Sequence, residues 1–462
     1  MGVSALGTAS GVLTQDLLDK LRAGDEAAQV TPIDFNITYE NDRKNALEIL
    51  DAKMTNLNDS MEALQTPALF DERQTSIVGT SVSVTAAANS DVQDFTLNVT
   101  QLATKQIEQS GSFGSNTDLI ATAAGSMNLN VDGVDYTIDY DATTTLEDLK
   151  KSINTIAGDG VDATIVQIAN GDYRLFLSSV NTGTTQDITL TDNSGNLSDD
   201  GGATAGGTNL TTGLVAVQTG VDANFEYNGQ AITRTSNEVN DLIVGYEITL
   251  SEVGSSQVSV TQNRDNILEK VDSFVSQYNA IMTELSALTK SSVDSNEKGI
   301  FSSDSTIKRM QQSLENMIGS AGEGVSTMYE FGFDVDKDGA LSIDKTVLNQ
   351  QLDANPKNVE AMFSGGDYTD AAGNTIAVKG MFVEMFSTTD ELSKYNGTLD
   401  LFKNSLTDRI SSLEDNRLKT IERLDSKYAV LQKQYAAYDA MIQRFNNSSS
   451  MFTEMANQSN GN

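Results

Sequence analysis

Apolar residues near both ends of the chain recur at alternating steps of three and four, the spacing of a helix that packs along one face. A last long helix is predicted over about 399–455. Its apolar seam consists of Ile421, Leu424, Tyr428, Leu431, Tyr435, Tyr438, Ile442 and Phe445. A second seam, near the N-terminus, consists of Leu47, Leu50, Met54, Leu57, Met61 and Leu64. A third begins at Ile267, Val271, Phe274 and Tyr278. Because the seams share one period, we expect them to pack in one bundle.

Between the helical ends the period changes to two, which is typical of half-buried strands. Phe95, Leu97 and Val99 alternate with polar residues, and the pairs Asp132-Gly133 and Asn228-Gly229 predict hairpin turns. The predicted fold class is therefore α+β and multidomain. The N- and C-terminal helices form a coiled-coil or helical-bundle stalk, and a mainly-β head of two subdomains is inserted between them.

The two ends of the chain lack the regular apolar spacing of the seams. After Pro32, the residues Asn36, Glu40 and Arg43 occupy positions where a seam would need apolar side chains. The N-terminal part of the stalk is therefore expected to stay disordered until a partner binds. Beyond Phe445 the seam fades, although apolar residues remain. The leg residues expected to face a partner are Leu13, Leu17, Leu21, Met451, Phe452 and Met455.

These patterns predict seven segments. They are a flexible N-terminal leg (1–45), a stalk helix (46–70), the first part of one head β subdomain (71–115), an inserted β subdomain (116–222), the second part of the first subdomain (223–262), stalk helices with a small hairpin (263–445) and a flexible C-terminal leg (446–462).

The charge balance excludes several function classes. The 462 residues include 65 acidic and 30 basic ones, a net charge of −35, so a nucleic-acid partner is not expected. No run of about 18 apolar residues exists, so no membrane insertion is expected, and residues 1–11 lack the features of a Sec signal. With no Cys and no His, the usual nucleophiles, bases and metal ligands are missing. We therefore expect no enzyme, no cofactor and no metal.

One local motif has the spacing of a calcium loop. Asp334, Asp336 and Asp338 precede Gly339, as ligands at positions 1, 3 and 5 precede the turn glycine. Position 12, however, is Lys345, where a bidentate Glu is needed. A tight Asp-Gly hairpin is therefore favoured, and calcium binding is left open.

Short motifs spread over nearly the whole chain resemble those of the flagellar filament-capping proteins, the hook-associated protein 2 family. They are Ser10-Gly11-Val12-Leu13-Thr14-Gln15-Asp16, Val99-Thr100-Gln101-Leu102-Ala103, Asn228-Gly229-Gln230, Thr233-Arg234-Thr235-Ser236-Asn237, Tyr278-Asn279-Ala280 and Asp338-Gly339-Ala340-Leu341-Ser342. The segment from Leu129 to Val180 is also similar to the insert of flagellins and hook-associated proteins.

The resemblance implies a structural cap at the distal end of the bacterial flagellar filament, secreted and extracellular, which promotes folding and polymerisation of exported flagellin and prevents its loss. It implies a homo-oligomer, with flagellin, a hook–filament junction protein and a flagellar export chaperone as partners. Two alternatives stay open: another flagellar axial protein (junction or filament subunit), and a surface adhesin.

Overall fold

The structure, a computed structural model, describes residues 6–12, 14–294, 297–320, 322 and 325–459. The chain divides into two compact units. The first, called the helical unit, comprises Met1–Leu69 and Asp265–Asn462, and the second, called the β unit, comprises Phe70–Arg264. Both ends of the chain therefore belong to one unit, into which the other is inserted.

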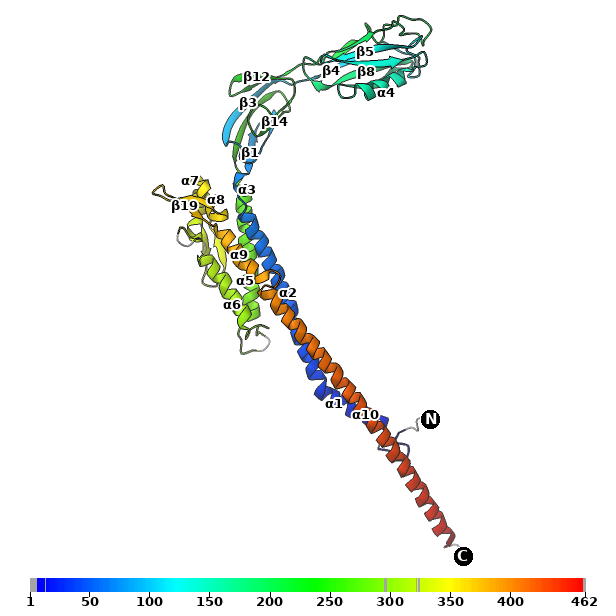
Figure 1. Ribbon diagram of the computed structural model, residues 1–462, viewed down its shortest axis with the longest axis vertical. Helices are drawn as coiled ribbons and strands as arrows, with labels where there is room; N and C mark the ends of the chain where they lie inside the picture. The colour runs from blue at the N-terminus through cyan, green and yellow to red at the C-terminus, as the bar shows by residue number, and fades with distance from the viewer. Residues whose placement is uncertain (1–5, 13, 295–296, 321, 323–324, 460–462) are drawn as a thin grey trace. The chain divides into compact units, whose positions relative to one another are not determined.

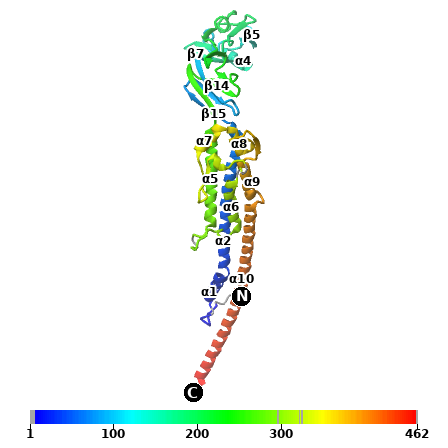
Figure 2. The ribbon, with the colours of Figure 1, turned by 90° about the vertical axis from the view of Figure 1, so that its left-hand side faces the viewer.

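The helical unit is built mainly from helices, the longest of which are α10 and α2. The helices are α1 (Gln15–Gln29), α2 (Thr31–Leu64), α5 (Arg264–Thr289), α6 (Ser305–Ser320), the 3-10 helix η1 (Met328–Phe331), α7 (Lys345–Ala354), α8 (Pro356–Ser364), α9 (Met381–Ser393) and α10 (Thr398–Ser459). Two hairpins accompany them, β16 (Phe333–Val335) with β17 (Leu341–Ile343) and β18 (Gly366–Thr369) with β19 (Thr375–Val378). Figure 1 and Figure 2 both show α10 beside α2 and α1, with its C-terminal part continuing past α1.

Local sequence explains where these helices start. The side chain of Thr14 accepts the backbone N–H of Leu17 at 3.2 Å and caps α1. Pro32 lies in the first turn of α2, where its missing N–H costs nothing. Asn355 caps α8, and Pro356 follows at the first helical position. The short helix α3 (Ala68–Asp71) then leads into the first strand.

The β unit contains two separate cores. The first lies between a five-stranded sheet, in the order β1-β15-β3-β11-β12, and a three-stranded sheet, β13-β14-β2. The strands are β1 (Arg73–Val78), β2 (Val82–Ala86), β3 (Gln93–Gln101), β11 (Ala223–Tyr227), β12 (Gln230–Arg234), β13 (Glu238–Val239), β14 (Tyr246–Leu250) and β15 (Gly254–Gln262). The alternating residues Phe95, Leu97 and Val99 of β3 are all buried in this core.

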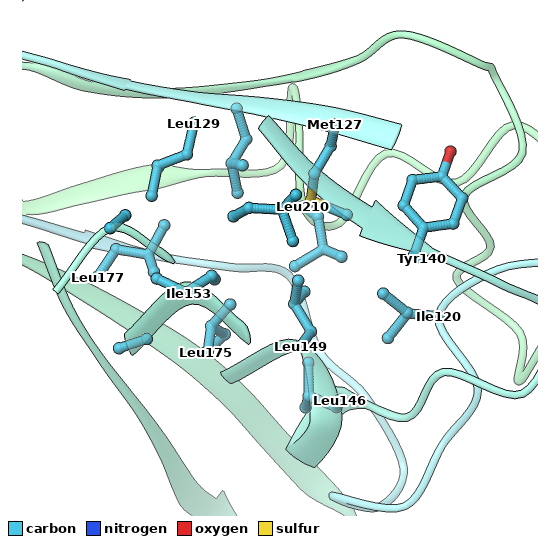
Figure 3. Close-up of a cluster of buried hydrophobic side chains, with 14 of the residues drawn as sticks. Ile120, Met127, Leu129, Tyr140, Leu146, Leu149, Ile153, Leu175, Leu177 and Leu210 are labelled. Carbon is cyan, nitrogen blue, oxygen red and sulfur yellow. The ribbon is translucent and has the colours of Figure 1, made fainter. Parts of the chain in front are cut away.

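The second core is enclosed by a four-stranded sheet, β10-β4-β8-β7, a three-stranded sheet, β6-β5-β9, and the helix α4 (Leu146–Ile156). The strands are β4 (Lys105–Gln109), β5 (Gly125–Val131), β6 (Val134–Tyr140), β7 (Val161–Ala169), β8 (Asp172–Thr182), β9 (Ile188–Asp192) and β10 (Val215–Gln218). Figure 3 shows Leu149 and Ile153 of α4 pointing toward Leu129 of β5 and Leu175 of β8. Every described pairing in the β unit is antiparallel.

The predicted fold class is confirmed: the terminal helices form a bundled stalk, and a mainly-β region with two cores is inserted between them in the sequence. The two leg segments differ from expectation. Residues 15–29 and 31–64 are helical, because α10 covers them and Glu40 is buried in an ion pair. The helix α10 continues to Ser459, past the point where the seam fades.

Candidate functional site

The seam of α2, the one nearest the N-terminus of the chain, is fully buried. Leu47, Leu50, Met54, Leu57, Met61 and Leu64 are each at most 1% exposed. On α5, Ile267, Val271, Phe274 and Tyr278 are 0% exposed, and the ring of Phe274 packs edge-on against Phe382 of α9 at 5.0 Å between centroids. These two seams form the interior of the helical unit. The burial of their apolar side chains contributes favourable free energy to folding.

The seam of α10 is buried only near its N-terminal end. Leu424 and Tyr428 are buried against Leu18 and Val30, and Ile421, Leu431, Tyr435 and Ile442 are half-buried. Tyr438 and Phe445 are 54% and 74% exposed, so the single chain does not cover these two seam residues. Asp439 is buried instead of Tyr438, because it accepts the backbone N–H of Ser10 at 2.8 Å.

Polar pairs fix the register of α10 against α1 and α2. Residues Lys403, Arg409, Arg417 and Lys427 of α10 pair in that order with Asp51, Glu40, Asp34 and Asp25. As the residue number rises along α10, its partner's number falls, so the helices are antiparallel. Most of these side chains are at least a third exposed, so each pair contributes no more than about 1 kcal/mol.

The contacts of Asp25 shift the pKa values of Asp25 and of its neighbour Tyr428. Lys427 Nζ lies 2.6 Å from Asp25 Oδ2, and the Tyr428 hydroxyl donates to the same oxygen at 2.8 Å. The hydrogen bonds from Lys427 and Tyr428 lower the pKa of Asp25. Burial and the Asp25 carboxylate together raise the pKa of Tyr428 to about 12. The α1–α10 contact therefore combines this polar pair with the apolar packing of Leu424 and Tyr428 against Leu18 and Val30.

Glu40 is the centre of a buried ion-pair cluster in α2. It is 3% exposed, and its two oxygens lie 2.8 Å from Arg43 Nη1 and 2.8 Å from Arg409 Nε. Arg43 also lies 3.1 Å from Asp304 and 5.2 Å from the ring of Phe301. We call Glu40, Arg43, Asp304 and Arg409 the Glu40 cluster. Its ion pairs join α2, α10 and the segment before α6. They lie in the part of α2 that precedes the apolar seam.

The predicted leg residues are mostly exposed where the structure describes them. Leu17 is half-buried and Leu21 is 45% exposed, while Leu13 lies outside the described residues. Met451, Phe452 and Met455 are 63%, 70% and 64% exposed on α10. The C-terminal part of this helix therefore presents apolar side chains that no described element covers.

Two family models match the chain, and they describe the N-terminal and C-terminal parts of the same protein family. The model for the N-terminus of flagellar hook-associated protein 2 matches residues 10–106, and the model for its C-terminus matches residues 220–447. The chain belongs to the flagellar hook-associated protein 2 family. Between the two matched ranges lies most of the second β core.

Members of this family from several bacteria are similar to the chain along most of its length. The Aeromonas caviae protein is 25% identical over 97% of both chains, and that of Escherichia coli K12 is 26% identical over 98% of this chain and 97% of its own. The Helicobacter pylori J99 protein is 30% identical over 53% of this chain, and the match spans only 37% of that longer protein. The solved structure of the Escherichia coli flagellar cap protein FliD, domains D1-D2-D3, shares the fold with a TM-score of 0.57 and 24% identity, over 78% of this chain and 99% of its own.

Asparagine side chains give the family motifs a physical role. Asn237 accepts the backbone N–H of Ala103 at 2.7 Å and donates to its carbonyl at 2.9 Å, which ties two motifs together across the first β core. Asn279 makes the same pair of bonds with Leu341, both at 2.8 Å. Asn228 accepts the N–H of Thr96 at 2.8 Å. Each asparagine thus satisfies backbone groups that would otherwise be unpaired.

The loop with calcium-like spacing is the turn of the β16–β17 hairpin. Asp336 Oδ1 accepts the N–H groups of Asp338 and Ala340 at 2.8 and 2.9 Å, and these bonds lower the pKa of Asp336. Within the described residues, no group of three acidic side chains is arranged to hold a metal ion. The described helices also include none that is long and apolar enough to cross a membrane.

Two features of the helical unit were missed by sequence reasoning. The apolar pattern places a break in the seam at Asn36, Glu40 and Arg43, although Glu40 and Arg43 are spaced for an i,i+3 pair. The helix α9 was not predicted, although Met381, Met385 and Thr389 recur at steps of four and are all buried. Thr389 donates to Asn58 of α2, so α9 also carries a polar contact within the bundle.

Proposed function

We propose that this protein is a structural cap at the distal end of the bacterial flagellar filament. There it promotes folding and polymerisation of exported flagellin and prevents its loss to the medium. The observation that carries the proposal is the order of the family matches, with both ends of the chain, folded into one helical unit, matching the two ends of hook-associated protein 2. A solved structure of the same fold is that of a flagellar cap protein.

The end of α10 is the part proposed to meet flagellin. Tyr438, Met441, Phe445, Phe452 and Met455 recur at helical spacing and are 54–74% exposed. An exposed apolar stripe of this kind favours docking against another helix. Leu13, Leu17, Leu21 and Met451 are assigned to the same leg. The stretch that loses its partner within the chain would thus gain one in the filament.

The buried seams of α2 and α5 are proposed to hold each copy's stalk together. The described seam residues on these helices are covered within one chain, so contacts between copies of a homo-oligomer would use other faces. Segments 1–45 and 446–462 are proposed to act as legs, and 46–70 with 263–445 as stalk. A hook–filament junction protein and an export chaperone are the further proposed partners. The role is structural rather than enzymatic, at the extracellular tip of the flagellum.

Deletion of the gene tests the proposal. We expect cells without filaments that release flagellin monomers into the medium, with both defects restored by the wild-type gene. Normal filaments in the deletion strain would contradict the cap. The alternatives, an axial subunit or an adhesin, receive no support from the comparisons, and an adhesin predicts normal filaments with lost attachment.

Complementation with leg variants tests the proposed contact. The double variant Phe445→Ser/Phe452→Ser removes the two most exposed side chains of the stripe and is expected to restore filaments poorly while leaving the protein folded. The control Val244→Ser/Val293→Ser removes apolar side chains that are 94% and 108% exposed outside the leg. If both variants restore filaments equally, the stripe is not the contact.

A further inference from the structure

One edge of the strand β9 is paired with no strand among the described residues. β9 (Ile188–Asp192) pairs with β5 and ends the three-stranded sheet β6-β5-β9, so within the described part of the chain its second edge is not part of any ladder. An edge strand presents a row of backbone donors and acceptors that can pair with another chain. The question is whether anything at this edge distinguishes it from an ordinary one.

The register shows which backbone groups face the free edge. The N–H of Asn193 donates to the carbonyl of Ser126 at 3.0 Å, one step beyond the pairing of Asp192 with Met127. Residues of an antiparallel strand alternate between bonding their neighbour and pointing away from it. The N–H and C=O groups of Ile188, Leu190 and Asp192 therefore point away from β5. The second edge of β9 thus carries three pairs of backbone groups at strand spacing, of which two belong to residues that are only 3% and 6% exposed, Ile188 and Leu190.

This edge opens into a hollow of the second β core. The hollow has a volume of about 600 Å³ and is lined along one side by Asp187 and all of β9. Glu108 of β4 and the segment around Thr211, Thr212 and Leu214 line the rest. One side of the hollow is thus the full length of β9. The other side is formed by Glu108 and the segment around Thr211. This gives a bound strand side-chain contacts as well as backbone bonds.

The hollow carries negative charge without a matching cation. Glu108 is 6% exposed, and one of its oxygens accepts the Gln106 side-chain amide at 2.5 Å. Among the described residues, no Lys or Arg forms an ion pair with Glu108, and Asp187, on the β9 side of the hollow, adds a second negative charge. Burial, opposed by the bond from Gln106 and reinforced by Asp187, raises the pKa of Glu108. A buried carboxylate in this setting is stabilised when a cation binds beside it.

We propose that the free edge of β9 binds an extended polypeptide segment of a partner protein as an added strand, with a Lys or Arg of that segment paired with Glu108. The occupant is a basic partner rather than a second copy of this chain. Residues 152–262 contain 13 acidic residues and only two basic ones, so the β unit of another copy would bring mostly like charge. The inference concerns a face of the β unit that the cap proposal does not use.

Peptide binding to the full-length protein tests this inference. The probe is a fluorescein-labelled pentapeptide, Thr-Val-Lys-Val-Thr, with blocked ends, and its affinity is measured by fluorescence anisotropy at low salt. A second peptide replaces Lys with Glu, and a third carries backbone N-methyl groups on alternate residues, which removes strand hydrogen bonds without changing the protein. We expect the Lys peptide to bind at least tenfold more tightly than either of the other two.

Variants of the chain locate the contact. Glu108→Gln keeps the shape of the side chain and its acceptor for Gln106, and is expected to weaken binding of the Lys peptide at least fivefold. Asp162→Asn on β7, an exposed carboxylate on another edge strand, removes the same charge and should change affinity less than twofold. Circular dichroism checks that both variants are folded.

Three outcomes would overturn the inference: no binding of the Lys peptide at millimolar concentration, equal binding of the N-methylated peptide, or equal affinity of wild type and Glu108→Gln. Sedimentation velocity covers the remaining occupant. If Glu108→Gln lowers self-association of the protein instead of peptide affinity, a second copy occupies the edge and the proposal fails.

Discussion

Replacing Glu40 with alanine is expected to destabilise the helical unit strongly. Glu40 is 3% exposed and holds Arg43 and Arg409 at 2.8 Å each. Removing its carboxylate leaves the guanidinium of Arg43 in the interior, beside the rings of Phe301 and Phe402, with Asp304 as its remaining charged partner. One Arg43 nitrogen, Nε, is already buried without a hydrogen-bond partner. The structure therefore has little means to compensate for the lost charge.

The magnitude follows from what remains buried. Removing one partner of a buried ion pair costs about 3–5 kcal/mol when the other charge is left alone. Because Asp304 stays 3.1 Å from Arg43, we expect Glu40→Ala to cost about 2–3 kcal/mol. Arg409 is 65% exposed, so Arg409→Ala should cost at most about 1 kcal/mol. The order of the two variants is the informative result.

Urea unfolding followed by circular dichroism at 222 nm measures these changes, because the long helices that dominate this signal belong to the helical unit. The control is Glu48→Ala, which removes an exposed carboxylate from the same helix and should shift stability by less than about 0.5 kcal/mol. A loss in Glu40→Ala no larger than that in Glu48→Ala would refute the view that the cluster stabilises the bundle.

Three further predictions test other parts of the molecule. Leu431 is only half-buried, so Leu431→Asp should cost about 1–2 kcal/mol in urea unfolding and Leu424→Asp, at 2% exposure, clearly more; equal losses would contradict the α10 seam. Leu149→Ala, at 0% exposure in the second β core, should cost about 2–5 kcal/mol, measured by tyrosine fluorescence, and a loss below about 1 kcal/mol would contradict that core. The Lys427 bond lowers the pKa of Asp25, so the stability that this bond contributes is present above the unfolded value of about 3.9 and is lost as the pH falls through the lowered folded value; limited pepsin digestion should cut α1 more slowly in wild type than in Asp25→Asn at pH 5, the two rates should approach each other at pH 3, and equal rates at both pH values would contradict the linkage.

Where one physical term dominates, sequence predicted structure well. The seam of α2 follows from apolar spacing alone, because burial of Leu50 and Met54 outweighs other contributions there. The hairpin turns follow from backbone chemistry. Asp132-Gly133 and Asn228-Gly229 adopt positive φ at both residues, which glycine accepts freely and Asp or Asn tolerates. The alternation of apolar and polar residues on either side of these turns then predicts strands, and so the inserted mainly-β region.

Prediction failed where charge replaced apolar packing. Glu40 has no apolar spacing to mark it, and its burial depends on Arg409, which lies 369 residues away in the sequence yet within 2.8 Å in space. The contact between α1 and α10 likewise includes pairs such as Asp25 and Lys427, beside the apolar packing of Leu18 against Leu424 and Tyr428. Such pairs are specified by the register of two distant helices. Sequence periodicity within one helix cannot supply that register, so the N-terminal end was expected to be disordered.

The most direct test of the cap proposal is the position of the protein on the filament. Immunogold labelling of intact flagella, with antibody raised against this chain and viewed by electron microscopy, distinguishes the possible sites. A cap predicts gold at the distal tip of each filament and none along its length. Gold along the whole filament, or only at the junction with the hook, would contradict the account.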